Sequence, residues 1–277
     1  MPLVIDRLRA EDLEAALRLS TQAGWNQIAA DWQRLLELSP EGCFAGRLDG
    51  ALVATATVAS YGRDAQWIGM VLVDEALRGR GFGSVLLARA IDHARSLGGD
   101  AIGLDATDLG RPVYLKHGFV DAAAIDRWTG VLRETGASDG LELLDRSTFD
   151  EVASLDRAAC GADRSALLLH LMHEPDVVGV VSPGAGFAFL RPGRSQNHVG
   201  PLVAADDETV SRLLNRLARL AGGSSVLLDA LRTPAMSARL ETHGLSVARR
   251  LMRMTSAPPQ TLLLGERVRA ATSFEWG

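Results

Sequence analysis

The chain has 277 residues, 47% of them hydrophobic, so it is long enough to bury a full core and to form one large or two ordinary domains. Its formal net charge of -5 argues against a general role in nucleic-acid binding. The two cysteines, Cys43 and Cys160, form neither a metal-ligand spacing nor a disulfide framework, which fits a reducing compartment. The start of the chain is too short and acidic for a signal peptide, and no apolar run approaches the length of a membrane span. We therefore expect a cytoplasmic protein.

The first half of the chain predicts strands and helices in the order strand, two helices, three strands, helix, strand, helix, strands. Apolar runs place the strands at 3–8, 43–48, 51–59, 67–73, 101–105 and from 119 to about 132. Apolar residues at three- and four-residue spacing place the helices at 11–20, about 28–36, 84–97 and around Tyr114. Pro112 is placed to open the last helix and Gly118 to close it. Asp49-Gly50 lies between two of the strands and predicts a hairpin.

The polar, glycine-rich stretch from Glu134 to Gly140 has no apolar periodicity, and we interpret it as a linker. After it the order of elements returns, with helices from 147 and at 164–171 and strands at 177–182, 186–191 and 198–203. The closest repeat in sequence is Leu228-Asp229-Ala230 with His243-Gly244-Leu245, against Leu104-Asp105-Ala106 with His117-Gly118-Phe119. We therefore predict an internal duplication, with domains at 1–134 and 141–277.

A basic glycine loop, Arg78-Gly79-Arg80-Gly81-Phe82-Gly83, joins the strand at 67–73 to the next helix. Glycines let the backbone turn tightly and approach a ligand, and the helix start presents free N–H groups and a positive dipole end. The loop therefore predicts a phosphate site. One alternative is a plain strand-to-helix turn with solvated arginines. A dinucleotide fold is another, since Asp105 ends the next strand, but Ser84 stands where a third glycine belongs and βα units do not repeat.

This loop, followed after the next strand by Tyr114-x-x-x-Gly118-Phe119, resembles the GNAT superfamily of acyl-CoA N-acyltransferases. The family's loop pattern is Gln/Arg-x-x-Gly-x-Gly/Ala, and all three defined positions match. The resemblance implies an α/β (α+β) protein of tandem GNAT-like domains, each a mixed, mostly antiparallel sheet flanked by helices. It also implies acetyl-CoA or coenzyme A as co-substrate, with loop amides on the pyrophosphate and the preceding strand paired to the pantetheine arm. The residues to which it assigns coenzyme binding are Met70, Val71, Leu72, Val73, Arg78, Gly79, Arg80, Gly81, Phe82, Gly83 and Ser84.

The resemblance also implies that Tyr114 donates a proton to the departing thiolate, which a phenol with an ordinary pKa of about 10 can do when it is close. The alternative is that Tyr114 packs in the core with a solvent-facing hydroxyl. Backbone N–H groups near Met70 and Val71 would stabilise the oxyanion, as strand amides do in the family.

The route for the proton of the attacking amine is less defined. Many relatives carry a glutamate on the central strand, whereas residues 67–73 contain no carboxylate. Asp105, Asp31 or a water chain to solvent could take the proton. Because Asp229 holds the matching place in the second half, a structural role for Asp105 is favoured.

In the GNAT fold, the segment between the first two helices lines the acceptor pocket. Here it contains Trp25, Asn26 and Gln27, with Asp31 close behind, so these four are the expected acceptor contacts. Equally, Trp25 could pack against both helices and hold them together, and Asn26 could cap the second helix. The histidines suggest no third ligand at a metal-binding spacing, so no metal site is expected.

The second half is predicted to lack the residues needed for coenzyme binding and acyl transfer. At the place of the glycine loop it reads Ala204-Ala205-Asp206-Asp207-Glu208, whose carboxylates suit a helix start and would repel a pyrophosphate. Leu240 takes the place of Tyr114. This plan resembles a bacterial GNAT subgroup with a degenerate GNAT-like C-terminal domain. Its sequence patterns are similar to Gly24-Trp25-Asn26-Gln27, Gly161-Ala162-Asp163-Arg164 and Gly200-Pro201-Leu202-Val203-Ala204.

The sequence thus predicts an N-acetyltransferase that moves the acetyl group of acetyl-CoA to a primary amine of a small molecule or peptide, by direct attack. A non-catalytic coenzyme A-binding or metabolite-sensing module is the alternative. An acyl donor longer than acetyl also stays open.

Overall fold

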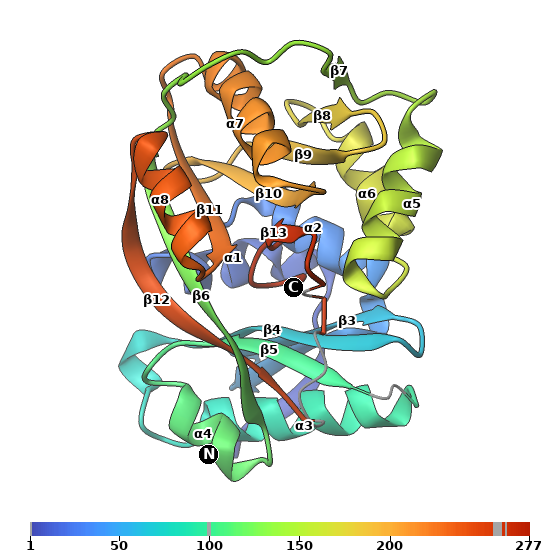
Figure 1. The fold of residues 1–277 in the computed structure, drawn as a ribbon. Helices are drawn as coiled ribbons and strands as arrows, with labels where there is room; N and C mark the ends of the chain where they lie inside the picture. Colours follow the sequence, from blue (N-terminus) through green and yellow to red (C-terminus); the bar gives the residue numbers. More distant parts are fainter. Residues whose placement is uncertain (1, 99–100, 257–261, 264) are drawn as a thin grey trace.

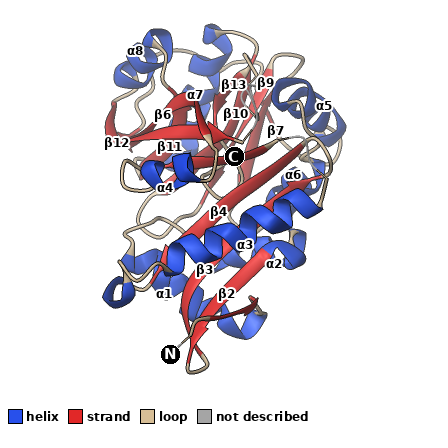
Figure 2. Cartoon of the chain, turned by 90° about the horizontal axis from the view of Figure 1, so that it is seen from below, coloured by secondary structure: helices blue, strands red, loops and turns tan. Residues whose placement is uncertain are grey.

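The computed structural model describes residues 2–98, 101–256, 262–263 and 265–277. Two α/β halves share one continuous sheet (Figures 1 and 2). Its 13 strands follow the order β1-β2-β3-β4-β5-β12-β6-β11-β13-β10-β9-β8-β7. Among the described strands, only the pairs β4–β5 and β10–β11 are parallel. The mixed, mostly antiparallel sheet flanked by helices is therefore confirmed.

The first half contains the elements up to residue 131, and they fall close to their predicted positions. They are β1 (Val4–Arg7), α1 (Leu13–Gln22), α2 (Ala29–Leu38), β2 (Cys43–Leu48), β3 (Ala51–Tyr61), β4 (Ala65–Val73), α3 (Phe82–Ser96), β5 (Ile102–Ala106), α4 (Arg111–Lys116) and β6 (Val120–Val131). Asp49 and Gly50 have φ of 50° and 82°, as the turn of a β2–β3 hairpin requires. Where several strands were expected after residue 119, the chain forms the one long strand β6.

The second half repeats this order from residue 142. Its elements are β7 (Glu142–Leu143), α5 (Phe149–Cys160), α6 (Ser165–His173), β8 (Val178–Ser182), β9 (Gly186–Arg191), β10 (Asn197–Ala204), α7 (Asp207–Ala221), β11 (Ser225–Leu231), α8 (Pro234–Thr242), β12 (Leu245–Thr255) and β13 (Val268–Ala270). The short strands β7 and β13 were not predicted, because two or three residues are too few to show a period.

The halves exchange their last long strands. The C-terminal part of β6 pairs with β11 of the second half, from Ile125 opposite Leu231 to Val131 opposite Ser225. In return, β12 pairs with β5 of the first half and lies between β5 and β6. The limits predicted for the two domains therefore divide the chain but not the sheet.

The segment 272–277 fills the space between the halves, where Figure 1 marks the C-terminus. The Tyr61 hydroxyl donates a 2.6 Å hydrogen bond to the Trp276 carbonyl, and the Trp67 indole donates one of 2.9 Å to the Phe274 carbonyl. Trp32, Trp67 and Trp276 belong to one buried core that includes residues of both halves. None of the described helices is both long and apolar enough to cross a membrane.

Candidate active site

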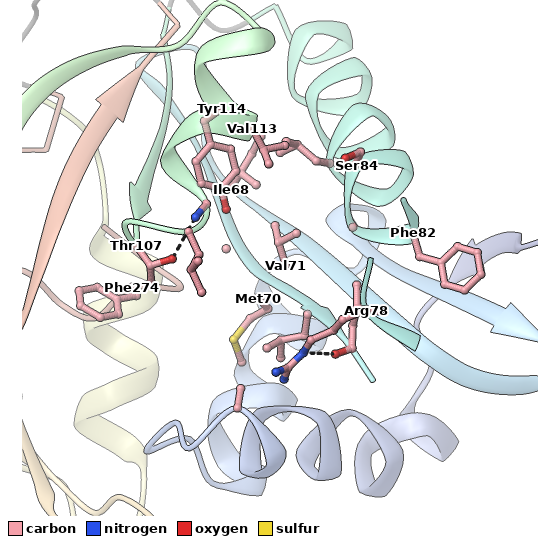
Figure 3. A pocket seen from close by; sticks show the side chains of 18 of the residues that line it. Ile68, Met70, Val71, Arg78, Phe82, Ser84, Thr107, Val113, Tyr114 and Phe274 are labelled. Carbon is pink, nitrogen blue, oxygen red and sulfur yellow. Dashed lines mark hydrogen bonds between the residues drawn. The ribbon is translucent and has the colours of Figure 1, made fainter. Parts of the chain in front are cut away.

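A cavity of about 740 Å³ opens at the C-terminal end of β4, and Figure 3 shows the side chains that line it. The first half supplies most of the wall, from β4, the glycine loop, the start of α3 and α4. The second half adds Arg249, Leu251 and Phe274. β12 and the C-terminal segment therefore complete one part of the cavity wall.

The cavity begins where β4 leaves β5. These parallel strands pair only at Gln66 with Ile102 and Trp67 with Gly103, and then they splay apart. From Ile68 to Val73, every residue of β4 lines the cavity. On its β5 side, this stretch offers backbone N–H and C=O groups that a second extended chain could pair with.

A bulge turns the middle of β4 out of the β3 ladder. The register shifts between Thr55, opposite Leu72, and Thr57, opposite Gly69, so Met70 and Val71 together face one residue of β3. Met70 has a φ of 49°, and the Thr55 hydroxyl fixes its carbonyl with a 2.8 Å hydrogen bond. This hydrogen bond holds the bulge in its conformation.

The glycine loop places an uncapped helix start on the same cavity. Gly79 and Gly81 have φ of 79° and 83°, a region that glycine enters without strain. Gly81 is the N-cap of α3, and no side chain accepts from the first-turn amides. In the second half, the Asp206 carboxylate caps α7 by accepting a 2.7 Å hydrogen bond from the Thr209 amide. Only the helix of the first half thus has amides available for an anion in this position.

The two loop arginines behave differently. Arg78 lines the cavity, and its Nε donates a long 3.4 Å hydrogen bond to the Val73 carbonyl (Figure 3). Arg80 is not among the lining residues, and its guanidinium lies 5.0 Å from the centre of the Phe82 ring. Of these two arginines, Arg78 is therefore the one that lines the cavity.

Tyr114 points from α4 into the cavity, toward the strand that carries Ile68 and Val71 (Figure 3). Its ring packs edge-on against Phe119 at 6.2 Å, and a Cβ at Gly110 would come within 3.0 Å of it. Its hydroxyl makes no hydrogen bond to another described residue. Burial raises the pKa of Tyr114 to about 12, so the phenol keeps its proton at neutral pH.

Asp105 is the one carboxylate among the described residues that line the cavity, and it is already paired. Both of its oxygens accept 2.8 Å hydrogen bonds from Arg253 of β12. Burial raises the pKa of Asp105, while the Arg253 charge opposes that shift. This geometry supports the structural reading of Asp105.

Two family profiles match the chain. One, described as the acetyltransferase (GNAT) family, matches residues 5–119, and another, the acetyltransferase (GNAT) domain, matches residues 152–264. The chain is a tandem GNAT protein. Both matched ranges lie inside the predicted domains, and the family is one of acyl-CoA N-acyltransferases.

Known proteins resemble this tandem GNAT protein along most of their length. Holothin acyltransferase of Pseudoalteromonas sp. (strain SANK 73390) is 27% identical over 212 residues, which covers 74% of this chain and 71% of the relative. The solved structure of a candidate acetyltransferase from Pyrococcus horikoshii has a TM-score of 0.86 at 21% identity and covers 99% of this chain and 96% of that one. A tandem GNAT protein from the clavulanic acid biosynthesis pathway has a TM-score of 0.64 at 17% identity, covering 94% and 100%. Both structures share its fold.

Of the four acceptor contacts predicted for the tandem GNAT protein, Trp25 lines the cavity and the other three do not. The Asn26 side chain accepts hydrogen bonds from the backbone amides of Ser195 and Gln196. Gln27 donates a 2.9 Å hydrogen bond to the Glu275 carboxylate. These two side chains therefore tie the α1–α2 segment to the second half.

Asp31 is buried, and both of its carboxylate oxygens accept hydrogen bonds. One oxygen accepts hydrogen bonds from Arg34 at 3.0 Å and from Arg191 at 2.6 Å, and the other accepts from the Ile28 amide at 2.8 Å. It therefore caps α2 and joins α2 to β9 rather than facing the cavity.

Sequence reasoning missed the cavity residues that the second half of this GNAT protein supplies. Phe274 lies on the Arg127 guanidinium, 4.0 Å from it, and Arg249 and Leu251 come from β12. No motif surrounds these residues. Their place follows from the strand exchange, which a pattern of strands and helices does not reveal.

Proposed function

We propose that this tandem GNAT protein is a cytoplasmic N-acetyltransferase that uses acetyl-CoA to acetylate a primary amine of a small molecule or peptide. One observation carries the proposal: an uncapped helix start, a strand edge without a described partner strand and a half-buried phenol face the same cavity. Each element suits one part of the co-substrate. The N-terminal half is the catalytic one, since Asp206 fills the corresponding anion position in the C-terminal half.

Acetyl-CoA would supply an activated acetyl group. The amides from Arg78 to Ser84 would hold its diphosphate, with Arg78 adding charge, and the β4 edge from Met70 to Val73 would bind its extended arm. The bulge amides of Met70 and Val71 would stabilise the negative charge that develops on the acyl oxygen as the amine attacks. Tyr114 would then donate its proton to the departing thiolate.

The proton of the amine needs a different route. Among the described residues that line the cavity, the only carboxylate is bound on both oxygens by Arg253, so no free base faces the amine. We therefore assign this proton to solvent through the open side of the cavity.

Release of coenzyme A thiol tests the proposal. The full chain is incubated with acetyl-CoA and a panel of primary amines, and thiol and acetylated product are measured together. We expect amine-dependent thiol release with matching product. A coenzyme A-binding module would instead show affinity and a thermal shift without product. Propionyl- and butyryl-CoA in the same assay address a longer acyl donor.

A further inference from the structure

Arg249 brings an unpaired positive charge to the cavity. It lies on β12, lines the cavity, and makes no hydrogen bond or ion pair with another described residue. Two other arginines nearby in the sheet, Arg253 and the half-buried Arg127, differ in this respect. Arg253 holds Asp105, and Arg127 holds Asp229, each with two hydrogen bonds of 2.8 Å. Arg249 is therefore the cation on this side of the cavity that is free to meet a ligand.

The position of Arg249 separates it from the coenzyme loop. The loop follows β4, whereas Arg249 lies on β12, and β5 stands between these two strands. Two strand spacings amount to roughly 10 Å, and the splay of β4 from β5 adds to that. Because Arg78 closely follows β4 and Arg249 lies on β12, the Arg249 charge faces a different part of the cavity.

The walls near Arg249 are apolar. Leu251 follows it on the same face of β12 by the period of a strand, and Phe274 and Trp25 are further apolar residues that line the same cavity. The charges of the cavity are also unbalanced, because Asp105 is neutralised by Arg253 while Arg249 has no partner. A cationic group on an acceptor would be repelled here, and an anionic group would find its counter-charge.

We propose that Arg249 selects an acceptor that carries an anionic group, a carboxylate or a phosphate, away from its amine. The proposal rests on the proposed function and adds the substrate class. The anion pairs with the Arg249 guanidinium, the body of the acceptor packs against Phe274 and Trp25, and the amine reaches toward the β4 bulge. The amine nitrogen then forms its bond to the acyl carbon, the C–S bond breaks, and the amine loses a proton to solvent.

The test compares matched acceptors and matched variants. The acceptors are 4-(aminomethyl)benzoate, its carboxamide and the corresponding phosphonate, so that a carboxylate and a phosphate-like group form separate arms. Arg249→Met removes the charge and keeps an apolar stem. Arg250→Met is the control, because Arg250 is exposed like Arg249 but lies on the opposite face of the same strand and does not line the cavity.

We expect one of the acids to be used with a kcat/KM about three- to fivefold above that of the carboxamide, since a charge pair at an exposed site has this order of strength. Arg249→Met should remove that preference through KM, with kcat nearly unchanged, while Arg250→Met keeps it. Affinity for coenzyme A should stay the same in both variants, which shows that they fold. Equal use of the acids and the carboxamide, or a preference that survives Arg249→Met, overturns the proposal.

A binding measurement separates this inference from the proposed function. Calorimetric titration of the acids into protein saturated with coenzyme A needs no turnover. If no amine is acetylated but an acid binds in an Arg249-dependent way, the anion site stands and the proposed function fails. If no acid binds at millimolar concentration, the anion site itself is refuted.

Discussion

The Asp105 carboxylate, in the first half of the chain, is held by the Arg253 guanidinium of the second half through two hydrogen bonds of 2.8 Å. The arrangement has a counterpart. Asp229 of the second half is held by Arg127 of the first through two bonds of the same length. The first pair joins β5 to β12, and the second joins β11 to β6. Each ion pair therefore holds one exchanged strand against a strand of the other half.

Arg253→Ala is expected to destabilise the protein by about 3–5 kcal/mol, because it leaves a buried carboxylate without its counter-charge. The side chains of Arg253 and Asp105 are 1% and 0% exposed, so solvent cannot take over that role. Urea unfolding measures the difference. Arg18→Ala is the control, since its pair with Glu14 is exposed and should contribute less than about 1 kcal/mol. A loss as small as that of the control would mean that the pair does not fasten the strands.

Because the halves exchange strands, they should unfold together. The core that contains Trp32, Trp67 and Trp276 spans both halves, and neither half completes its own sheet. We expect tryptophan fluorescence and far-UV circular dichroism to give one coincident transition in urea. Two resolved transitions would instead indicate halves that are stable on their own, and differential scanning calorimetry gives an independent check.

The sequence predicted the elements of each half well, because long amphipathic segments carry their own period. The helix after the glycine loop buries Leu86, Leu87, Ala90, Ile91 and Ala94 as its spacing indicates. The sequence could not predict that the two halves exchange strands. A strand that reads Val120–Val131 fits equally well beside β5 of its own half or beside β11, and the choice depends on long-range contacts such as Arg127 with Asp229.

Gly81→Val should weaken coenzyme A binding by more than about tenfold, since the loss of even one charge-assisted amide contact has that effect. Gly81 has a φ of 83°, which a β-branched residue adopts only with strain, so the loop would leave this conformation and turn its amides away. Isothermal titration with coenzyme A measures the affinity. Gly98→Val is the matched control, because Gly98 has a φ of 71° at the other end of α3. Comparable weakening in both variants would point to damage of the helix rather than of the loop.

As with the fold, the part of the candidate site that depends on local sequence pattern was predictable, and the part that depends on long-range packing was not. The residues to which coenzyme binding was assigned come from one strand–loop–helix stretch, and of these assigned residues all but Arg80 line the cavity. The acceptor side is assembled from distant parts of the chain. The segment between α1 and α2 suggested acceptor contacts at Asn26, Gln27 and Asp31. Their side chains instead form hydrogen bonds with residues of the second half, more than 150 positions away.

Tyr114→Phe should lower kcat by about 10²–10⁴ and leave coenzyme A affinity unchanged, because it removes only the proton that the thiolate needs. The acidic form of the phenol is the active one, so activity from this group is lost as pH rises through its pKa. Burial raises that pKa to about 12, whereas an ordinary tyrosine titrates near 10. The rate of the wild-type protein should therefore show no alkaline decline from Tyr114 below about pH 11, measured as kcat with the amine in its neutral form. A decline near pH 9 that disappears in Tyr114→Phe would contradict the buried, protonated donor, and an unchanged kcat in the variant would remove Tyr114 from the reaction.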